Sequence, residues 1–224
     1  NVPQAVIYRL DAAGQRTLVY NVEPFGRQSI TLSARERVQV EYELIIGEGA
    51  GEVSQRLVIP LACPIAWFFS PVPDSCPISD ADPTAIVEQA FERGRMIYVA
   101  SEGRIYVLYN DGRTPAWASY QDVYRPGVDP ERDENFDRAL AGTTFVQPVG
   151  RLGFLWRGLD NVRNRLGNGT APELSFEGFF QEAPTRDTAN AGPNDLYITS
   201  SEGTVIQLLP SGSQWQILTP SDGP

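Results

Sequence analysis

Two stretches of the sequence decide the fold class: Met96-Ile97-Tyr98-Val99-Ala100-Ser101-Glu102-Gly103 and, further along the chain, Leu196-Tyr197-Ile198-Thr199-Ser200-Ser201-Glu202-Gly203. Each is an apolar run rich in β-branched and aromatic residues that ends in a Ser-Glu-Gly turn. A second β-rich run follows each turn, and each of these is followed by a Gly-containing turn and a tryptophan, Trp117 or Trp215. We therefore expect an internal repeat that forms two three-stranded antiparallel meanders.

The composition is that of an acidic globular protein. The chain has 224 residues, of which 42% are hydrophobic and 21% charged, and its net charge is −10. This length suffices for one large domain or two small ones with real cores. The negative charge argues against binding to nucleic acid or to anionic lipid, because both would repel it.

The basic residues restrict the available chemistry. The sequence contains no histidine, and all 18 residues in the Lys+Arg count are arginine. Catalysis by a Ser-His-Asp or Cys-His site, metal binding by histidine and Schiff-base chemistry by lysine are therefore excluded. A glycosidase-type carboxylate pair remains permitted, and Glu102 and Glu202 occupy equivalent turns. We favour solvated turn residues over catalysis, and we predict a protein that is not an enzyme and has no cofactor.

The N-terminal 62 residues contain only strand signals. Apolar and polar residues alternate in several short runs that are separated by turn residues, which is typical of antiparallel strands with one solvated face. The expected strands are 5–10, 16–20, 29–33, 37–44 and 52–62. Their number and pattern favour a β-sandwich-like domain over residues 1–62. The Tyr-rich strand followed by a closing strand resembles the later part of an immunoglobulin-like or fibronectin type III-like domain, which implies an open edge that a partner or further strands cover.

A proline-rich linker follows over residues 63–81. It contains the two cysteines of the chain, Cys63 and Cys76, each followed by proline. We favour a disulfide over two buried thiols, because such a loop cannot hold its shape through backbone pairing. A disulfide predicts an oxidising compartment outside the cytoplasm. The longest apolar run, 57–69, is short and contains prolines, so we expect this segment not to span a membrane.

Aromatic residues form the candidate interaction surface. Trp67, Phe68 and Phe69 lie together in the linker, where they either attach the first domain to the second or present an exposed surface to a partner or a sugar. Amphipathic rings also suit saccharide faces. The further candidates are Tyr98, Tyr106 and Trp117.

The second domain, residues 82–220, should combine the meanders with helix. Asp82-Pro83 and Gly94 predict a short helix over 83–93. Apolar residues at helical spacing from Leu155 to Leu166 predict one amphipathic helix over 153–166. We therefore expect a C-terminal α+β domain of two three-stranded meanders and one amphipathic helix, in a protein that is mainly β.

The segment 125–144 is polar and is predicted to be a loop. It contains an acidic run with Asp129, Asp133 and Asp137, which is a weak candidate for a calcium site because it lacks the order and the glycine of an EF-hand. A solvated acidic loop is the favoured interpretation. Asn168-Gly169-Thr170 matches the N-glycosylation pattern, but a Gly-containing turn that happens to end in threonine is the favoured interpretation.

Several strings resemble known bacterial modules. They are Phe91-Glu92-Arg93-Gly94, Tyr106-Val107-Leu108-Tyr109-Asn110-Asp111-Gly112, Trp156-Arg157 and Val162-Arg163-Asn164-Arg165-Leu166-Gly167. Over roughly residues 63–218 the chain resembles uncharacterised extracytoplasmic modules of bacteria that follow immunoglobulin-like domains. It is more distantly similar to the LGFP repeats of bacterial cell-wall proteins. The resemblance implies a cell-surface location and no established catalytic activity.

We therefore expect a non-catalytic extracytoplasmic module that binds a protein partner in cell-surface adhesion or assembly. The alternative is a carbohydrate-binding module that uses exposed tryptophan and tyrosine to bind cell-wall polysaccharide. A partner that covers the open edge of the N-terminal domain fits the first hypothesis.

Overall fold

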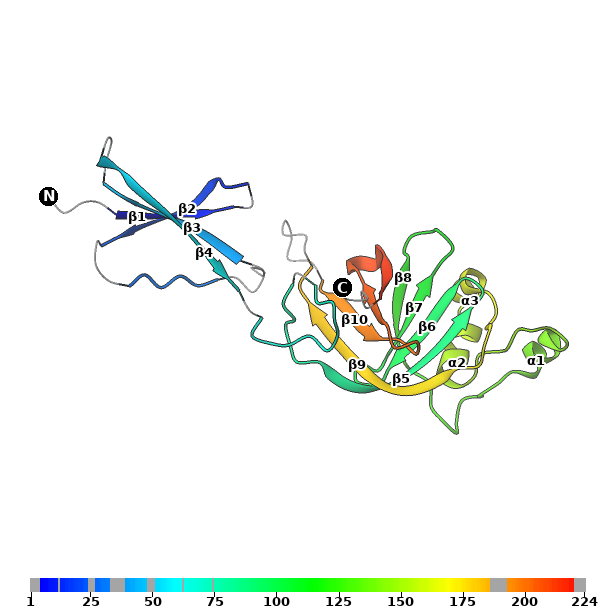
Figure 1. Ribbon diagram of the computed structural model, residues 1–224. Helices are drawn as coiled ribbons and strands as arrows, with labels where there is room; N and C mark the ends of the chain where they lie inside the picture. Colours follow the sequence, from blue (N-terminus) through cyan, green and yellow to red (C-terminus); the bar gives the residue numbers. More distant parts are fainter. Residues whose placement is uncertain are drawn as a thin grey trace. The chain divides into compact units, whose positions relative to one another are not determined.

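The computed structural model describes residues 5–11, 13–23, 27–32, 39–47, 51–61, 63–73, 75–185 and 193–219. The chain divides into two compact units (Figure 1). The first comprises Asn1–Pro64 and Pro73–Cys76, and the second comprises Ile65–Val72 and Pro77–Pro224. Both are built mainly from antiparallel strands.

The first unit is a four-stranded antiparallel sheet of order β2-β1-β3-β4. Its strands are β1 (Ala5–Leu10), β2 (Arg16–Val22), β3 (Gln39–Ile46) and β4 (Val53–Pro60). The hairpin of β1 and β2 and the two later strands lie where the sequence predicts them. The described residues of this unit form one sheet and not the two facing sheets of a complete sandwich.

The prediction of a strand over 29–33 was wrong for the described residues 29–32, which belong to no strand. Ile30 and Leu32 instead line an apolar pocket together with side chains of the sheet. Alternate side chains of an extended chain can be buried without any pairing of its backbone, so alternation alone did not distinguish the two cases. Ser33 lies outside the described residues.

The second unit contains one eight-stranded antiparallel sheet of order β12-β11-β10-β9-β5-β6-β7-β8. The strands are β5 (Asp82–Phe91), β6 (Gly94–Val99), β7 (Arg104–Tyr109), β8 (Trp117–Gln121), β9 (Leu174–Ala183), β10 (Asp195–Thr199), β11 (Val205–Leu208) and β12 (Trp215–Leu218). Each half is a run of four consecutive strands, and β5 and β9 join the halves at the centre. The sheet is strongly curved, so that its ends approach each other (Figure 1).

The prediction of a helix over 83–93 was wrong, because Asp82–Phe91 form β5 and the next two residues form the turn that follows it. Thr84, Ile86 and Glu88 are buried at every second position, which is the period of a strand. Proline is tolerated at the beginning of a strand as well as in the first turn of a helix, so Pro83 did not discriminate. Each half of the sheet therefore contains one strand more than the predicted three-stranded meander.

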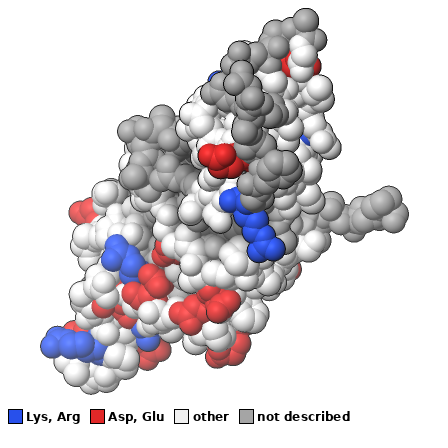
Figure 2. Space-filling model, turned by 90° about the vertical axis from the view of Figure 1, so that its left-hand side faces the viewer, with Lys and Arg blue, Asp and Glu red and all other residues white. Residues whose placement is uncertain are grey.

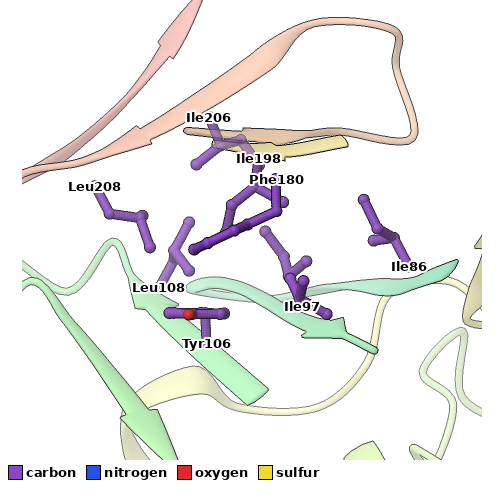
Figure 3. Close-up of a cluster of buried hydrophobic side chains, with 9 residues drawn as sticks. Ile86, Ile97, Tyr106, Leu108, Phe180, Ile198, Ile206 and Leu208 are labelled. Carbon is purple, nitrogen blue, oxygen red and sulfur yellow. The ribbon is translucent and has the colours of Figure 1, made fainter. Parts of the chain in front are cut away.

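The concave side of the curved sheet holds the main core. Side chains from both halves point toward one another there, as Figure 3 shows. The buried members are Ile86, Ile97, Val99, Tyr106, Leu108, Phe180, Ile198, Ile206 and Leu208. Trp117 and Trp215, both half-buried, pack against the same cluster.

Three helices lie between the halves in the sequence: α1 (Glu134–Leu140), α2 (Gly150–Gly158) and α3 (Asp160–Leu166). The single helix predicted over 153–166 is interrupted at Leu159, whose backbone is extended. The guanidinium of Arg163 donates to the carbonyl oxygen of Arg157 at 3.0 Å, which satisfies one group left free at this break. The interruption also leaves Leu159 exposed, although the helical spacing placed it on the buried face.

The helices cover the convex side of the first half. Leu152, Trp156, Val162 and Leu166 pack there against strand residues such as Met96. The indole of Trp156 donates to the carbonyl oxygen of Gly167 at 2.8 Å, where the chain leaves α3. No helix within the described parts of the chain has the length and apolar character that a membrane crossing requires.

Two tryptophans join the ends of the sheet reciprocally. Trp117 Nε1 donates to the carbonyl oxygen of Leu209 at 2.8 Å, and Trp215 Nε1 donates to that of Tyr109 at 3.0 Å. The backbone N–H of Ala116 donates to the carbonyl oxygen of Gly212 at 2.7 Å. Each half therefore donates hydrogen bonds to, and accepts them from, the other at this seam.

Candidate functional site

The predicted disulfide is present between Cys63 and Cys76, which are 13 residues apart in the sequence. Closing a loop of this length stabilises a fold by about 3 kcal/mol in the chain-entropy model. The bond therefore fixes the proline-rich segment at its two ends.

The aromatic residues of the linker pack against the convex side of the second half of the sheet. Trp67 and Phe69 contact Tyr197, with ring centroids 4.7 and 5.5 Å from its ring. Phe68 stacks on Phe179 at 5.5 Å. All three linker rings are half-buried. This aromatic segment, Trp67–Phe69, thus covers strands of the second unit, to which it belongs.

A buried glutamine fixes this segment to β9. The side-chain amide of Gln181 donates to the carbonyl oxygens of Ala66 and Ser79, both at 3.0 Å, and its oxygen accepts from the backbone N–H of Phe68 at 3.4 Å. Gln181 is only 1% exposed. Because every polar atom of the amide is used, the attachment is specific and not merely apolar.

The remaining aromatic candidates lie on the other half of the sheet and are used in packing. Tyr106 is 2% exposed and belongs to the main core, where burial raises the pKa of its hydroxyl. Trp117 packs on the same core and takes part in the seam. Tyr98 is half-buried, with the guanidinium of Arg151 over its ring at 3.9 Å. The structure does not bring these rings together with the linker aromatics in one described cluster.

The acidic run does not gather its carboxylates around one point. Asp129 accepts from Arg125 and Asp137 accepts from Arg132, and these arginines lower the pKa of both carboxyl groups. Asp133 caps α1 through the N–H of Asn135 at 2.8 Å, which is why part of the predicted loop is helical. Within the described ranges there is no group of three or more metal-ligating side chains.

The two turn glutamates have different surroundings. Glu202 lies 3.8 Å from Arg95, while burial and the charge of Glu182 raise the pKa of Glu102. Sequence analysis overlooked a third acid, Glu88, which was assigned to a helix. Glu88 is 4% exposed, forms an ion pair with Arg95 at 2.7 Å and accepts from the N–H of Ser201 at 2.7 Å. It therefore links the two halves of the sheet.

An exposed apolar surface of the first unit lies on and beside β4. All eight residues of this strand are exposed, and the exposed fractions of Leu57, Val58 and Ile59 are 55%, 44% and 38%. The strand lies at the edge of the sheet, and among the described residues it pairs with β3 alone. Within that part of the chain, one long side of its backbone therefore offers N–H and C=O groups that no other strand pairs with.

A pocket of about 360 Å³ opens on the sheet face beside this edge. Leu57 and Ile59 line it, together with Ile7, Val40, Tyr42, Leu44 and the segment that contains Ile30 and Leu32. The β4 surface, which we define as β4 and this pocket, thus combines an open strand edge with an apolar hollow. The signal in the sequence was the run Leu57-Val58-Ile59, where side chains of both faces are apolar.

Acidic side chains cover more of the face drawn in Figure 2 than basic ones do, in keeping with the net charge of −10. Comparisons with known proteins place the chain in no family: no family model, no curated protein and no solved structure matches it.

Proposed function

We propose that the chain is a non-catalytic extracytoplasmic binding module, and that its β4 surface receives an extended segment of a protein partner in a cell-surface assembly. The observation that carries the proposal is that all eight residues of β4 are exposed, including three consecutive apolar residues from Leu57 to Ile59. Large exposed apolar surface next to an open strand edge is typical of protein interaction sites.

An extended strand is the occupant that this geometry fits best. A strand of a partner can form hydrogen bonds with a whole row of N–H and C=O groups along an edge, and its alternate side chains would enter the pocket lined by Leu57 and Ile59. The charge of β4 does not oppose this, because its single charged residue, Arg56, already forms an ion pair with Glu41.

The disulfide supports the location. A bond between Cys63 and Cys76 persists in an oxidising compartment, and the thiols of a cytosolic protein would be kept reduced. Thiol titration of the denatured, unreduced protein from its native cells should find no free thiol. Two free thiols together with recovery in the cytoplasmic fraction would exclude the proposed location.

Selection from a phage-displayed peptide library tests the binding surface. The intact chain should retain peptides in which apolar residues alternate, and a variant with Leu57→Asp and Ile59→Asp should lose them. Leu174→Asp, at an equally exposed position of the second unit, is the matched control and should bind as the unmodified chain does. Equal binding by the β4 variant and the control would contradict the proposal.

A further inference from the structure

The two outer strands of the first unit differ in regularity. Within the described residues these strands are β2 and β4. The pairing of β2 with β1 shifts its register between Arg9 and Leu10, and irregularities of this kind protect many natural sheet edges from further pairing. β4 pairs with β3 without any shift from Val53 to Pro60. The edge that a further strand can extend is therefore that of β4.

The sequence of β4 lacks the usual protection of an edge strand. Natural edges are often very short, or contain charged side chains or an internal proline. β4 has eight residues, and Pro60 is the last of them. Arg56 is its one charged residue, and Glu41 of β3 neutralises it. Nothing in this strand therefore opposes pairing with a second strand.

The two faces of the sheet set different requirements for that second strand. Leu57 and Ile59 lie on the face that holds the pocket. Arg56 lies on the opposite face, because side chains alternate along a strand. A strand that extends the sheet should therefore add apolar side chains on the pocket face and place no positive charge opposite Arg56.

We propose that β4 receives β4 of a second copy of this chain, paired antiparallel about a two-fold axis at Leu57. The proposal rests on the proposed function and names its partner. β4 of another copy meets both requirements, since it has the same apolar residues on the pocket face and one charged residue. Pairing of a surface with itself closes at two copies, so a dimer and not a filament is expected.

The charge of Arg56 selects the register. A two-fold axis that sets a strand beside its own copy in antiparallel orientation is perpendicular to the sheet, so one residue lies opposite itself. An axis at Arg56 would oppose two guanidinium groups, which is unfavourable. An axis at Val58 would leave the first residues of β4 beyond the end of the partner strand. The axis at Leu57 avoids both.

In this register nearly the whole strand is paired. Arg56 lies opposite Val58 of the second copy, and Ser54 lies opposite Pro60, so the missing N–H of proline falls at the end of the ladder. The perpendicular axis keeps the pocket faces of both copies on one side. Leu57 therefore contacts its own counterpart there, and the two apolar surfaces become continuous across the shared edge.

Sedimentation equilibrium of the intact, oxidised chain tests the dimer. At about 0.15 M salt, which screens the charge of −10 on each copy, a concentration-dependent equilibrium between one and two copies is expected. Sedimentation as a single copy up to about 1 mM would overturn the proposal. If peptides still bound through β4 in that case, the proposed function would stand and only its assignment to a second copy would fall.

A charge on the edge tests the register. Val58→Arg should weaken the dimer by about two- to thirtyfold, because each new arginine would face Arg56 of the other copy. Within its own sheet it lies opposite Glu41, so the fold should be retained. Val19→Arg is the matched control, at an exposed position of the other edge strand, and should leave the dimer unchanged. Equal effects of the two variants would contradict the pairing through β4.

Cross-linking locates the axis directly. In the proposed register the Cα atoms at position 57 of the two copies are about 4.5–5.5 Å apart, within the range of a disulfide. Leu57→Cys should therefore oxidise to a covalent dimer. Val53→Cys is more exposed, but its two copies would lie about 27 Å apart and should not cross-link. No covalent dimer with Leu57→Cys, or equal yields from both variants, would refute the register.

Discussion

Replacing Trp117 or Trp215 by phenylalanine removes one of the two indole hydrogen bonds that join the ends of the eight-stranded sheet. A hydrogen bond of this kind contributes about 1 kcal/mol net. The smaller ring also loses apolar contact with the core, which costs about 1 kcal/mol more. Each single replacement should therefore lower the free energy of unfolding of the second unit by about 2 kcal/mol.

The double replacement carries the test. Both bonds need the same juxtaposition of β8 and β12, together with the contact between Ala116 and Gly212. Loosening the seam by one replacement therefore weakens the second bond as well, and the double variant should lose less than the sum of the single losses. A coupling of about 1 kcal/mol is expected, within the range found for residues in one network.

Trp156→Phe is the matched control. Its indole bond to Gly167 joins α2 to the end of α3 and does not cross the seam. Combined with Trp215→Phe it should be additive to within about 0.5 kcal/mol. Urea unfolding followed by tryptophan fluorescence measures these values, because all four tryptophans lie in the second unit. Additive losses for Trp117 and Trp215 would refute the idea that the seam acts as one element.

Three further outcomes are expected. Asp111→Asn should destabilise the second unit by about 3 kcal/mol or more, because it leaves the nearly buried Arg165 without its bidentate partner; the Tm measures this. Arg165 lowers the pKa of Asp111, so the ion pair stabilises the fold at pH values above the unfolded pKa of about 4. As the pH falls below that value, the free energy of unfolding measured with urea should decrease more in the unmodified chain than in the Asp111→Asn variant. Reducing the disulfide should lower the stability of the first unit by about 3 kcal/mol in denaturant titrations monitored by circular dichroism, and no change would contradict its structural role. Gly94→Ala should abolish or severely weaken folding, because its Cβ would lie 1.9 Å from the carbonyl oxygen of Leu108. The Cβ of Gly112→Ala would meet nothing within 4 Å, so this control variant should only strain a turn. The expression level and the Tm of the two variants distinguish these outcomes.

Sequence analysis recovered the features that depend on local patterns. The hairpin of β1 and β2, the two sequential meanders and the disulfide follow from alternation, turn residues and proline content. The helix predicted over 83–93 failed because Pro83 and Gly94 fit two explanations. Gly94 has a φ of 143° and lies at the turn between β5 and β6, so it marks a hairpin and not the end of a helix.

The site residues were harder to predict because burial is a tertiary property. Nothing local in the sequence distinguishes Gln181, which fixes the aromatic segment to β9, from a solvated glutamine on a strand. The carbonyl groups to which it donates, those of Ala66 and Ser79, lie 102 or more positions earlier in the sequence. The Leu57-Val58-Ile59 run was visible, but only the edge position of β4 shows that no other strand covers it among the described residues.

The two copies of the sequence repeat differ in the register of their strand pairing. Val99 pairs with Arg104 across the first turn, whereas Thr199 pairs with Val205 across the second, so the register differs by one residue. Because side chains alternate, such a shift exchanges the two faces of a strand. Ile97 accordingly lies in the concave core, and Tyr197, its counterpart in the sequence, lies on the convex side.

This exchange explains why the two halves need different covers. In the first half Met96 lies on the convex side, where helices α2 and α3 bury it. In the second half the same side carries Tyr197, whose ring is covered by Trp67 and Phe69 of the linker. The aromatic segment therefore does for the second half what the helices do for the first. Its composition is set by the large ring that the register places there, and removing that ring by Tyr197→Ala should release the segment to proteolysis while α2 and α3 stay protected.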